Sequence, residues 1–220
     1  MDDYLSEKEQ IQKIRRWWSE NGAFVIAGLV LGIGGLTGWN FWQSWQLRQA
    51  EEAAAVYQEL VATTDAGDRE TAMSGLDTLV ADYGRTPYVD QGRLMVARLN
   101  VEQGDLAAAA ELLQALVDGT RDPELERIGR VRLARVLIAD QRADEALDVL
   151  DLDRAGIFMA RFHELRGDIL ADRGETEAAR EEYGLALAAA SSGVVDAQAV
   201  RLKLDALGSA APTEAEDNAS

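Results

Sequence analysis

The hydrophobic and polar positions of this 220-residue chain divide it into two parts. Residues 23–42 form a run of twenty positions without a charge, whereas charged residues recur throughout the sequence that follows. A helix rises about 1.5 Å per residue and closes its own backbone hydrogen bonds, so a run of this length covers the roughly 30 Å hydrocarbon core of a bilayer. We therefore expect one transmembrane helix at residues 23–42, which would tether everything downstream of it.

The residues on either side of this run predict its orientation. Four Lys or Arg residues precede it, whereas only Arg48 occurs in the twenty residues that follow. Because cytoplasmic flanks are enriched in Lys and Arg, residues 1–22 are expected to lie in the cytoplasm. Tryptophan rings favour the headgroup level of a membrane. The five tryptophans of the chain flank the run as expected interface anchors: Trp17, Trp18, Trp39, Trp42 and Trp45.

Two alternatives to a membrane span stay open. A cleaved secretory signal has an apolar stretch of only about 7 to 15 residues, followed by small residues at the cleavage site. Ala53, Ala54 and Ala55 could act as such a site, but they lie well beyond a run that is already too long. A core helix of a soluble domain needs a polar face, and residues 23–42 have none.

The sequence after the run repeats itself with the period of a helix-turn-helix unit. An alanine recurs at separations of 37, 37 and 33 residues, close to the roughly 34-residue tetratricopeptide period. Four positions later, on the same helical face, each unit has a leucine or a tyrosine. The alanines are Ala72, Ala109, Ala146 and Ala179, and the residues one turn later are Leu76, Leu113, Leu150 and Tyr183.

An earlier helix is predicted ahead of the alanine in each of the last three units. Apolar residues at three- and four-residue spacing predict these first helices over residues 88–103, 124–140 and 158–173. Each contains a small residue that would let the paired helices approach closely. These small residues are Ala97, Ala134 and Gly167.

The turns inside the units also follow a pattern. Gly67, Gly104 and Gly174 stand after the first helix in three units, and Gln141 stands there in the remaining one. A glycine at the end of a helix can take a positive φ without steric cost, and Gln141 departs from this pattern. A terminal helix over residues 194–207 is expected to cover the last unit, because the end of a solenoid must be capped.

Together these patterns predict an all-α chain, in which a single N-terminal transmembrane helix precedes a tetratricopeptide-like α-solenoid of about four helix pairs. A plain helical bundle with alanine-rich packing is the alternative, which the regular period disfavours. Residues 44–61 contain neither Gly nor Pro, so the membrane helix is expected to continue into the first repeat helix. The expected division is a cytoplasmic segment 1–22, a membrane helix 23–42, a periplasmic domain 43–208 and a disordered tail 209–220.

Composition argues against several classes of function. The chain has 22 basic and 39 acidic residues, and its net charge of −17 would repel nucleic acid. It has no cysteine, which excludes disulfide and thiolate chemistry. His163 is the only histidine and is interpreted as a surface or packing residue, because no metal-binding, phosphate-binding or nucleophile motif accompanies it. We predict a protein that is not an enzyme and binds no cofactor or metal.

The apolar run contains a candidate contact for another membrane helix. Gly28, Gly32 and Gly35 share one helical face, where close approach of two backbones drives association in lipid. Glycine is also common in membrane helices without such a role, and the pattern favours neither interpretation over the other.

The repeat domain contains a second candidate binding surface. Arg98, Arg135 and Asp168 occupy the same place in successive units, one residue after the small position. On the concave side of the array they would hold an extended or acidic client segment through charge-assisted hydrogen bonds. The alternative is that they make local surface ion pairs of little energetic consequence.

These features in this order resemble a known bacterial family. The segments that carry the likeness are WWSENG, GWNFWQSW, VRLARVLIADQRADEALDVLD and ELRGDILADRGE. They are similar to the ancillary SecYEG translocon subunit family, also called YfgM. The resemblance implies a bitopic inner-membrane protein that binds the SecYEG translocon and a membrane-anchored periplasmic chaperone of the PpiD type. It also implies that the protein assists folding or trafficking of exported client proteins through protein–protein binding.

A second function stays open on the same fold. A membrane-tethered tetratricopeptide scaffold for the assembly or regulation of another envelope complex would need the same span and the same solenoid, because a fold alone does not determine function.

Overall fold

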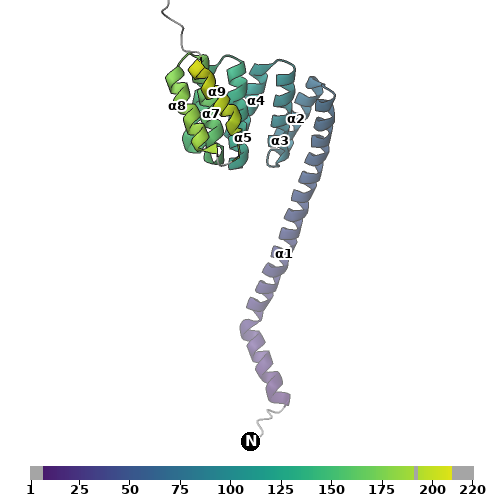
Figure 1. The fold of residues 1–220 in the computed structure, drawn as a ribbon. Coiled ribbons are helices and arrows are strands. Elements are labelled where there is room, and N and C mark those ends of the chain that lie inside the picture. The colour runs from purple at the N-terminus through teal and green to yellow at the C-terminus, as the bar shows by residue number, and fades with distance from the viewer. Residues whose placement is uncertain (1–6, 191–192, 210–220) are drawn as a thin grey trace, which may run out of the picture. The chain divides into compact units, whose positions relative to one another are not determined.

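The structure, a computed structural model, describes residues 7–190 and 193–209, and all regular structure in these ranges is helical (Figure 1). This confirms the predicted all-α class. The helices are α1 (Glu7–Asp65), α2 (Arg69–Tyr83), α3 (Tyr88–Glu102), α4 (Leu106–Gly119), α5 (Pro123–Ala139), α6 (Ala143–Val149), α7 (Met159–Asp172), α8 (Thr176–Ala188) and α9 (Ala197–Ser209), with the 3₁₀ turns η1 (Leu152–Arg154) and η2 (Gly156–Phe158) between α6 and α7.

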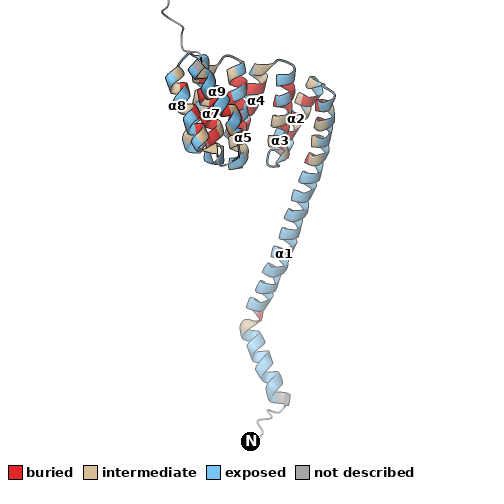
Figure 2. Ribbon diagram, viewed as in Figure 1, coloured by how far each residue is buried: buried red, intermediate tan, exposed pale blue. Residues whose placement is uncertain are grey.

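Two compact units make up the chain, Met1–Glu52 and Ala53–Ser220. The first contains most of α1, the one described helix that is long and apolar enough to cross a membrane. Only 6% of its most apolar window is buried, and Figure 2 shows this part of α1 as exposed. A core helix would be mostly buried, so this finding argues against that alternative. Helix α1 runs without interruption through residues 44–61, as the sequence predicted.

The second unit is a series of helix pairs whose contact faces are those that the period predicted. The final turns of α1 pack on α2, and the pairs α3–α4, α5–α6 and α7–α8 follow. The four recurring alanines are all 0% exposed. The residues one turn later are at most 3% exposed. Removing these faces from water supplies the main driving force for stacking the units.

The turn inside each unit has one conformation. Gly67, Gly104 and Gly174 have φ values of 73°, 81° and 76°, and Gln141 adopts 61° although it has a side chain. In all four turns the next backbone N–H donates to a carbonyl five residues earlier, at N···O distances of 2.8 to 2.9 Å, which ends the first helix in the same way.

The third unit departs from the others because its second helix is short. Helix α6 has only 7 residues, and the chain then forms η1 and η2. The Asp151 side chain accepts the Asp153 N–H at 3.0 Å, which starts η1. The Arg130 Nη1 of α5 donates to the Val149 carbonyl at 3.0 Å, so the carbonyl at the truncated end is hydrogen-bonded. Arginine side chains of α5 therefore bind the backbone at the end of α6 and in the turns that follow it.

Helix α9 begins and ends later than the sequence predicted. Asp196 accepts the N–H groups of Gln198 and Ala199 at 2.9 and 3.3 Å, so this residue caps the helix and sets its start. The helix continues to Ser209, which was expected to begin the tail. The rest of that expected tail, residues 210–220, lies outside the described residues.

We predict that Gly167→Ala destabilises the repeat domain. A Cβ at this position would lie 2.6 Å from the Cδ1 of Tyr183, whose side chain is buried, so the ring would have to move. Overpacking of this kind costs about 1–3 kcal/mol, more than the roughly 1 kcal/mol of helix propensity that alanine adds. Urea unfolding of the full-length protein, followed by circular dichroism, measures the change.

The control for this substitution is Gly184→Ala on α8. A Cβ there would meet nothing within 4 Å, so the change is expected to stabilise the protein by roughly 0.5–1 kcal/mol. Equal effects of the two substitutions would contradict the close contact between Gly167 and Tyr183.

Candidate protein-binding surfaces

The glycine face predicted in the apolar run has no packing partner inside the protein. A Cβ added at Gly28, Gly32 or Gly35 would meet nothing within 4 Å. The expected anchors are exposed as well, with side chains between 45% and 62% exposed. Trp39 and Trp42 lie with ring centroids 5.3 Å apart. This surface is therefore free to contact lipid or another helix, and its role stays a prediction.

The first helices of successive units carry the predicted row of charged residues at equivalent places. Arg98 lies on α3, Arg135 on α5 and Asp168 on α7, each directly after a buried small residue. The same step of 33 residues that separates Arg135 from Asp168 leads on to Arg201 of α9. Arg201 follows Val200, which is 0% exposed, as the other members of the row follow Ala97, Ala134 and Gly167.

Helix α9 is therefore the first helix of an incomplete fifth unit, and Arg201 is the fourth member of the row. Sequence reasoning missed this residue because it treated α9 only as a cap. The 33-residue step was the signal that would have found it.

The two arginines predicted for this row are exposed. The Arg98 side chain is 59% exposed and lies 3.3 Å from Glu102 and 3.9 Å from Asp65, whose side chains are also mostly exposed. Such surface pairs contribute little, typically about 0–1 kcal/mol. Arg135 is exposed, and no carboxylate among residues 7–190 and 193–209 is in ion-pair contact with it. Both guanidinium groups are available to a partner.

Asp168 differs, because its carboxylate is already occupied. The Tyr183 hydroxyl donates to its Oδ1 at 2.8 Å, and the Nζ of Lys203 lies 2.8 Å from each of its oxygens. Lys203 also donates to Glu164 at 2.9 Å. The row therefore does not present Asp168 as an open carboxylate, because the Tyr183 hydroxyl of α8 and the Lys203 amine of α9 occupy its oxygens.

The cluster formed by Asp168, Glu164, Tyr183 and Lys203 shifts the pKa of Lys203 and of Tyr183. Burial lowers the pKa of the Lys203 amine, but the hydrogen bonds and charges of Asp168 and Glu164 outweigh this, so the pKa of Lys203 is raised above its usual value. Burial, followed by the hydrogen bond to Asp168, raises the pKa of Tyr183. Lys203 therefore stays cationic and Tyr183 neutral near pH 7, and both hold the α7 carboxylate in place.

His163 is a packing residue, which agrees with its interpretation from the sequence. It is 8% exposed, and its Nδ1 lies 2.6 Å from a Glu182 carboxylate oxygen. The Arg166 Nε donates to the other oxygen of Glu182 at 2.9 Å. The described residues contain no group of three or more His, Cys, Asp and Glu side chains that could hold a metal ion.

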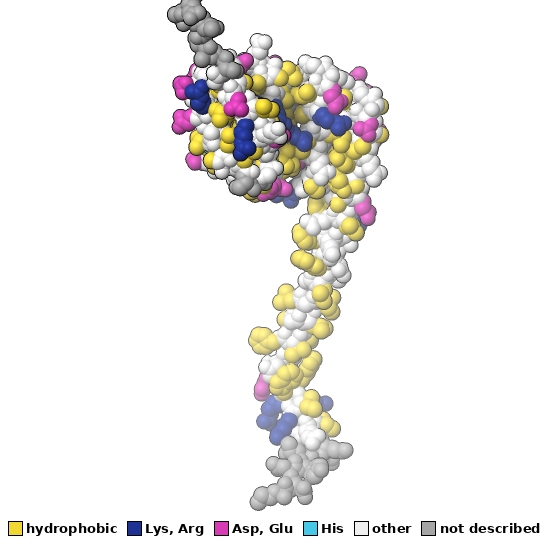
Figure 3. Space-filling model, in the orientation of Figure 1, with side chains coloured by type: hydrophobic (Ala, Val, Ile, Leu, Met, Phe, Trp, Pro, Cys, Tyr) yellow, Lys and Arg dark blue, Asp and Glu magenta, His cyan; other side chains and the backbone are white. Residues whose placement is uncertain are grey.

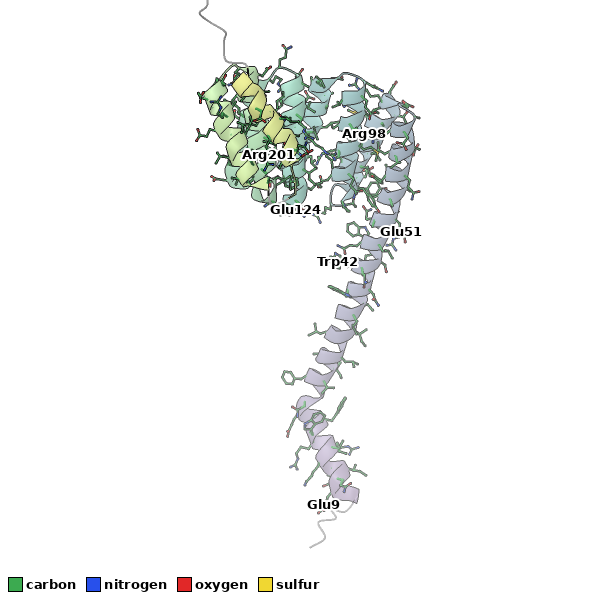
Figure 4. All side chains as sticks on the ribbon, viewed as in Figure 1. Glu9, Trp42, Glu51, Arg98, Glu124 and Arg201 are labelled. Atoms are coloured by element: carbon green, nitrogen blue, oxygen red, sulfur yellow. The ribbon has the colours of Figure 1, made fainter. Side chains whose placement is uncertain are left out.

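The row lies on a hollowed face of the repeat domain. Figure 3 shows this hollow with dark blue Lys and Arg side chains inside it. Figure 4 labels Arg98 on α3 and Arg201 on α9. The arrangement provides guanidinium groups that can form paired hydrogen bonds with carboxylates.

Comparison with known proteins supports both the fold and its likeness to translocon subunits. Residues 15–209 match the family described as tetratricopeptide repeat-like domain. The ancillary SecYEG translocon subunit of Escherichia coli (strain K12) is 33% identical over 184 residues, which cover 83% of this chain and 88% of that protein. The protein of the same name in Haemophilus influenzae is 29% identical, with 92% and 98% covered.

A solved structure resembles the repeat domain in fold alone. The crystal structure of a Podosopora anserina protein with nearly identical TPR-like repeats has a TM-score of 0.52 and 16% sequence identity. The likeness covers 73% of this chain and 86% of that one. Together with the family match, it confirms the predicted tetratricopeptide-like architecture.

We predict that Lys203→Met destabilises the C-terminal end of the solenoid. It removes the cation shared by Asp168 and Glu164, and the Glu164 side chain is only 7% exposed. The Lys203 side chain is 36% exposed, so solvent screening limits the expected loss to about 1–2 kcal/mol in urea unfolding. The control Arg201→Met, on the same helix, should change stability by less than about 0.5 kcal/mol. Equal losses in both variants would show that the cluster does not hold α9.

Proposed function

This chain belongs to the family of ancillary SecYEG translocon subunits and contains a tetratricopeptide repeat-like domain. We propose on that basis that it is a membrane-tethered, protein-binding subunit of the Sec translocon. The observation that carries the proposal is the combination of two free surfaces in one chain. An exposed apolar helix bears an unpacked glycine face, and a helical solenoid presents an exposed row of arginines. The likeness to the relatives extends over both parts, since it covers 83% or more of the chain.

The apolar run at residues 23–42 is proposed to cross the inner membrane once. Residues 1–22 would stay in the cytoplasm, since they hold most of the flanking cations, and residues 43–208 would lie in the periplasm. The tryptophans would sit among lipid headgroups. Gly28 and Gly32, with Gly35, would contact a helix of SecYEG, because lipid provides no hydrophobic force and close packing must drive the association.

The repeat domain is proposed to bind proteins on the outer side of the membrane. Its partners would be a membrane-anchored periplasmic chaperone of the PpiD type and exported client proteins as they leave the translocon. The protein would assist their folding or trafficking by binding alone, without catalysis. A solenoid suits this role because it presents an extended surface along which an unfolded segment can lie.

We predict that Gly28→Leu with Gly32→Leu weakens recovery of SecYEG with the protein. Leucine at both positions would fill the face on which a partner helix must approach closely. The measurement is the amount of SecYEG recovered with the affinity-tagged protein from detergent-solubilised membranes, and we expect a loss of severalfold.

The matched control is Ile26→Leu with Val30→Leu, which keeps two leucines in the run but places them on the opposite face. Normal recovery of SecYEG is expected with this control. If the glycine variant also recovered SecYEG normally, the glycine contact would be wrong. Recovery of another envelope complex in place of SecYEG would favour the scaffold function.

We predict that the protein resists carbonate extraction and exposes its repeat domain on the periplasmic side. An apolar helix of this length in the hydrocarbon core is not displaced by alkaline washing, because that treatment removes only peripheral proteins. In spheroplasts, added protease should digest the repeat domain while the cytoplasmic membrane is intact. Release by carbonate would refute the span, and digestion only after the membrane is opened would refute the orientation.

A further inference from the structure

The charge of the repeat domain is distributed unevenly. The residues after position 42 have 18 basic and 34 acidic side chains. Most of the arginines in the described domain are in ion pairs: Arg69, Arg93, Arg98, Arg127, Arg130, Arg142, Arg154, Arg161, Arg166, Arg173 and Arg180. Arg132 and Arg135 of α5 and Arg201 of α9 are exposed, and no carboxylate in the described ranges makes an ion pair with them.

These unpaired cations share the hollowed face. Arg135 and Arg201 belong to the row that begins at Arg98, and Arg132 lies one turn before Arg135 on the same side of α5. The hollow in Figure 3 accordingly contains Lys and Arg side chains, although the domain as a whole is acidic. An unpaired exposed guanidinium keeps all of its donors for a ligand.

Helix α9 adds positive charge at the C-terminal end of this face. On α7 the row presents Asp168, with Glu164 one turn before it, and Arg161 of the same helix pairs with Glu164. The Lys203 amine binds both carboxylates, at 2.8 and 2.9 Å. Lys203 of α9 and Arg161 of α7 together balance these two carboxylates, and α9 adds the exposed cation Arg201 at the next place in the row.

We propose that α9 and Arg201 complete a basic groove, with Arg132 and Arg135 at its centre, that binds an extended acidic segment of a partner protein. The inference rests on the proposed protein-binding function and specifies the chemistry of its ligand. Neighbouring packed helices lie about 8–10 Å apart. An extended chain of the polyproline II type advances about 3.1 Å per residue and brings its side chains back to the same side every three residues. Acidic residues three positions apart in the segment would therefore meet Arg98 on α3 and Arg135 on α5. A further acidic residue six positions beyond would meet Arg201 on α9, past Asp168 of α7.

The experiment measures binding of a defined peptide to the full-length protein in a non-ionic detergent. The probe is a fluorescein-labelled peptide that repeats Glu-Ser-Ser, and its uncharged counterpart repeats Gln-Ser-Ser. Fluorescence anisotropy should show binding of the first and not of the second. The affinity should fall as salt is added, because exposed charges are screened.

The decisive variant is Arg135→Glu with Arg201→Glu. It should lower the affinity for the acidic peptide by at least about tenfold. The matched control is Arg85→Glu with Arg121→Glu, which reverses two exposed arginines that likewise lack an ion-pair partner among the described residues but lie in the α2–α3 and α4–α5 turns. The control should bind as the original protein does. Circular dichroism checks that both variants fold, and Arg201→Gln alone provides a milder test of the α9 contribution.

Three outcomes would overturn the proposal. They are equal binding of the two peptides, an unchanged affinity in the Arg135 and Arg201 variant, and an equal loss in the turn control. Binding that occurs only after residues 210–220 are removed would also overturn it, because the acidic tail of the chain itself would then be the occupant. Loss of peptide binding with normal recovery of SecYEG would leave the proposed translocon function intact.

Discussion

Close approach of paired helices at a small residue is the contact on which the rest of the repeat domain depends. Ala97, Ala134 and Gly167 let the second helix of each unit lie directly against the first, and the recurring alanines do the same from the other side. Where Tyr183 fills this contact, only glycine fits opposite its ring. Because each unit packs in this way, successive first helices take equivalent positions, and the residue after the small one always lies on the same face. The arginine row is therefore a consequence of core packing.

The apolar part of α1 follows a different constraint. Its side chains are exposed, and its glycines have no neighbour within the protein. Exposure of such an apolar surface to water is unfavourable, whereas its contact with the hydrocarbon chains of lipid carries no such penalty. The proposed function assigns separate tasks to the two parts. The apolar helix can recognise a partner only through the shape of its surface, whereas the repeat domain can also use charged side chains. This division explains how a small chain could join a membrane complex and still hold a water-soluble partner.

Helix α9 shows how one element can serve both stability and binding. Val200 closes the apolar core of the last unit, and Lys203 forms ion pairs with Asp168 and Glu164 of α7. These contacts hold α9 in the position that the first helix of a fifth unit would take. In that position Arg201 becomes a member of the row. A helix in another register at this end of the solenoid would present a different groove.

The sequence by itself determined the helical class, the apolar run, the repeat period and the glycine turns, because these depend on residues close together in the chain. It also located Arg98 and Arg135, whose exposure follows directly from that period. Only the tertiary structure decided the state of Asp168, since its partner Lys203 is 35 residues away and nothing in the local pattern pairs them. The short α6 and the register of α9 likewise depend on contacts between elements, so the placement of charges along the groove is a property of the folded chain.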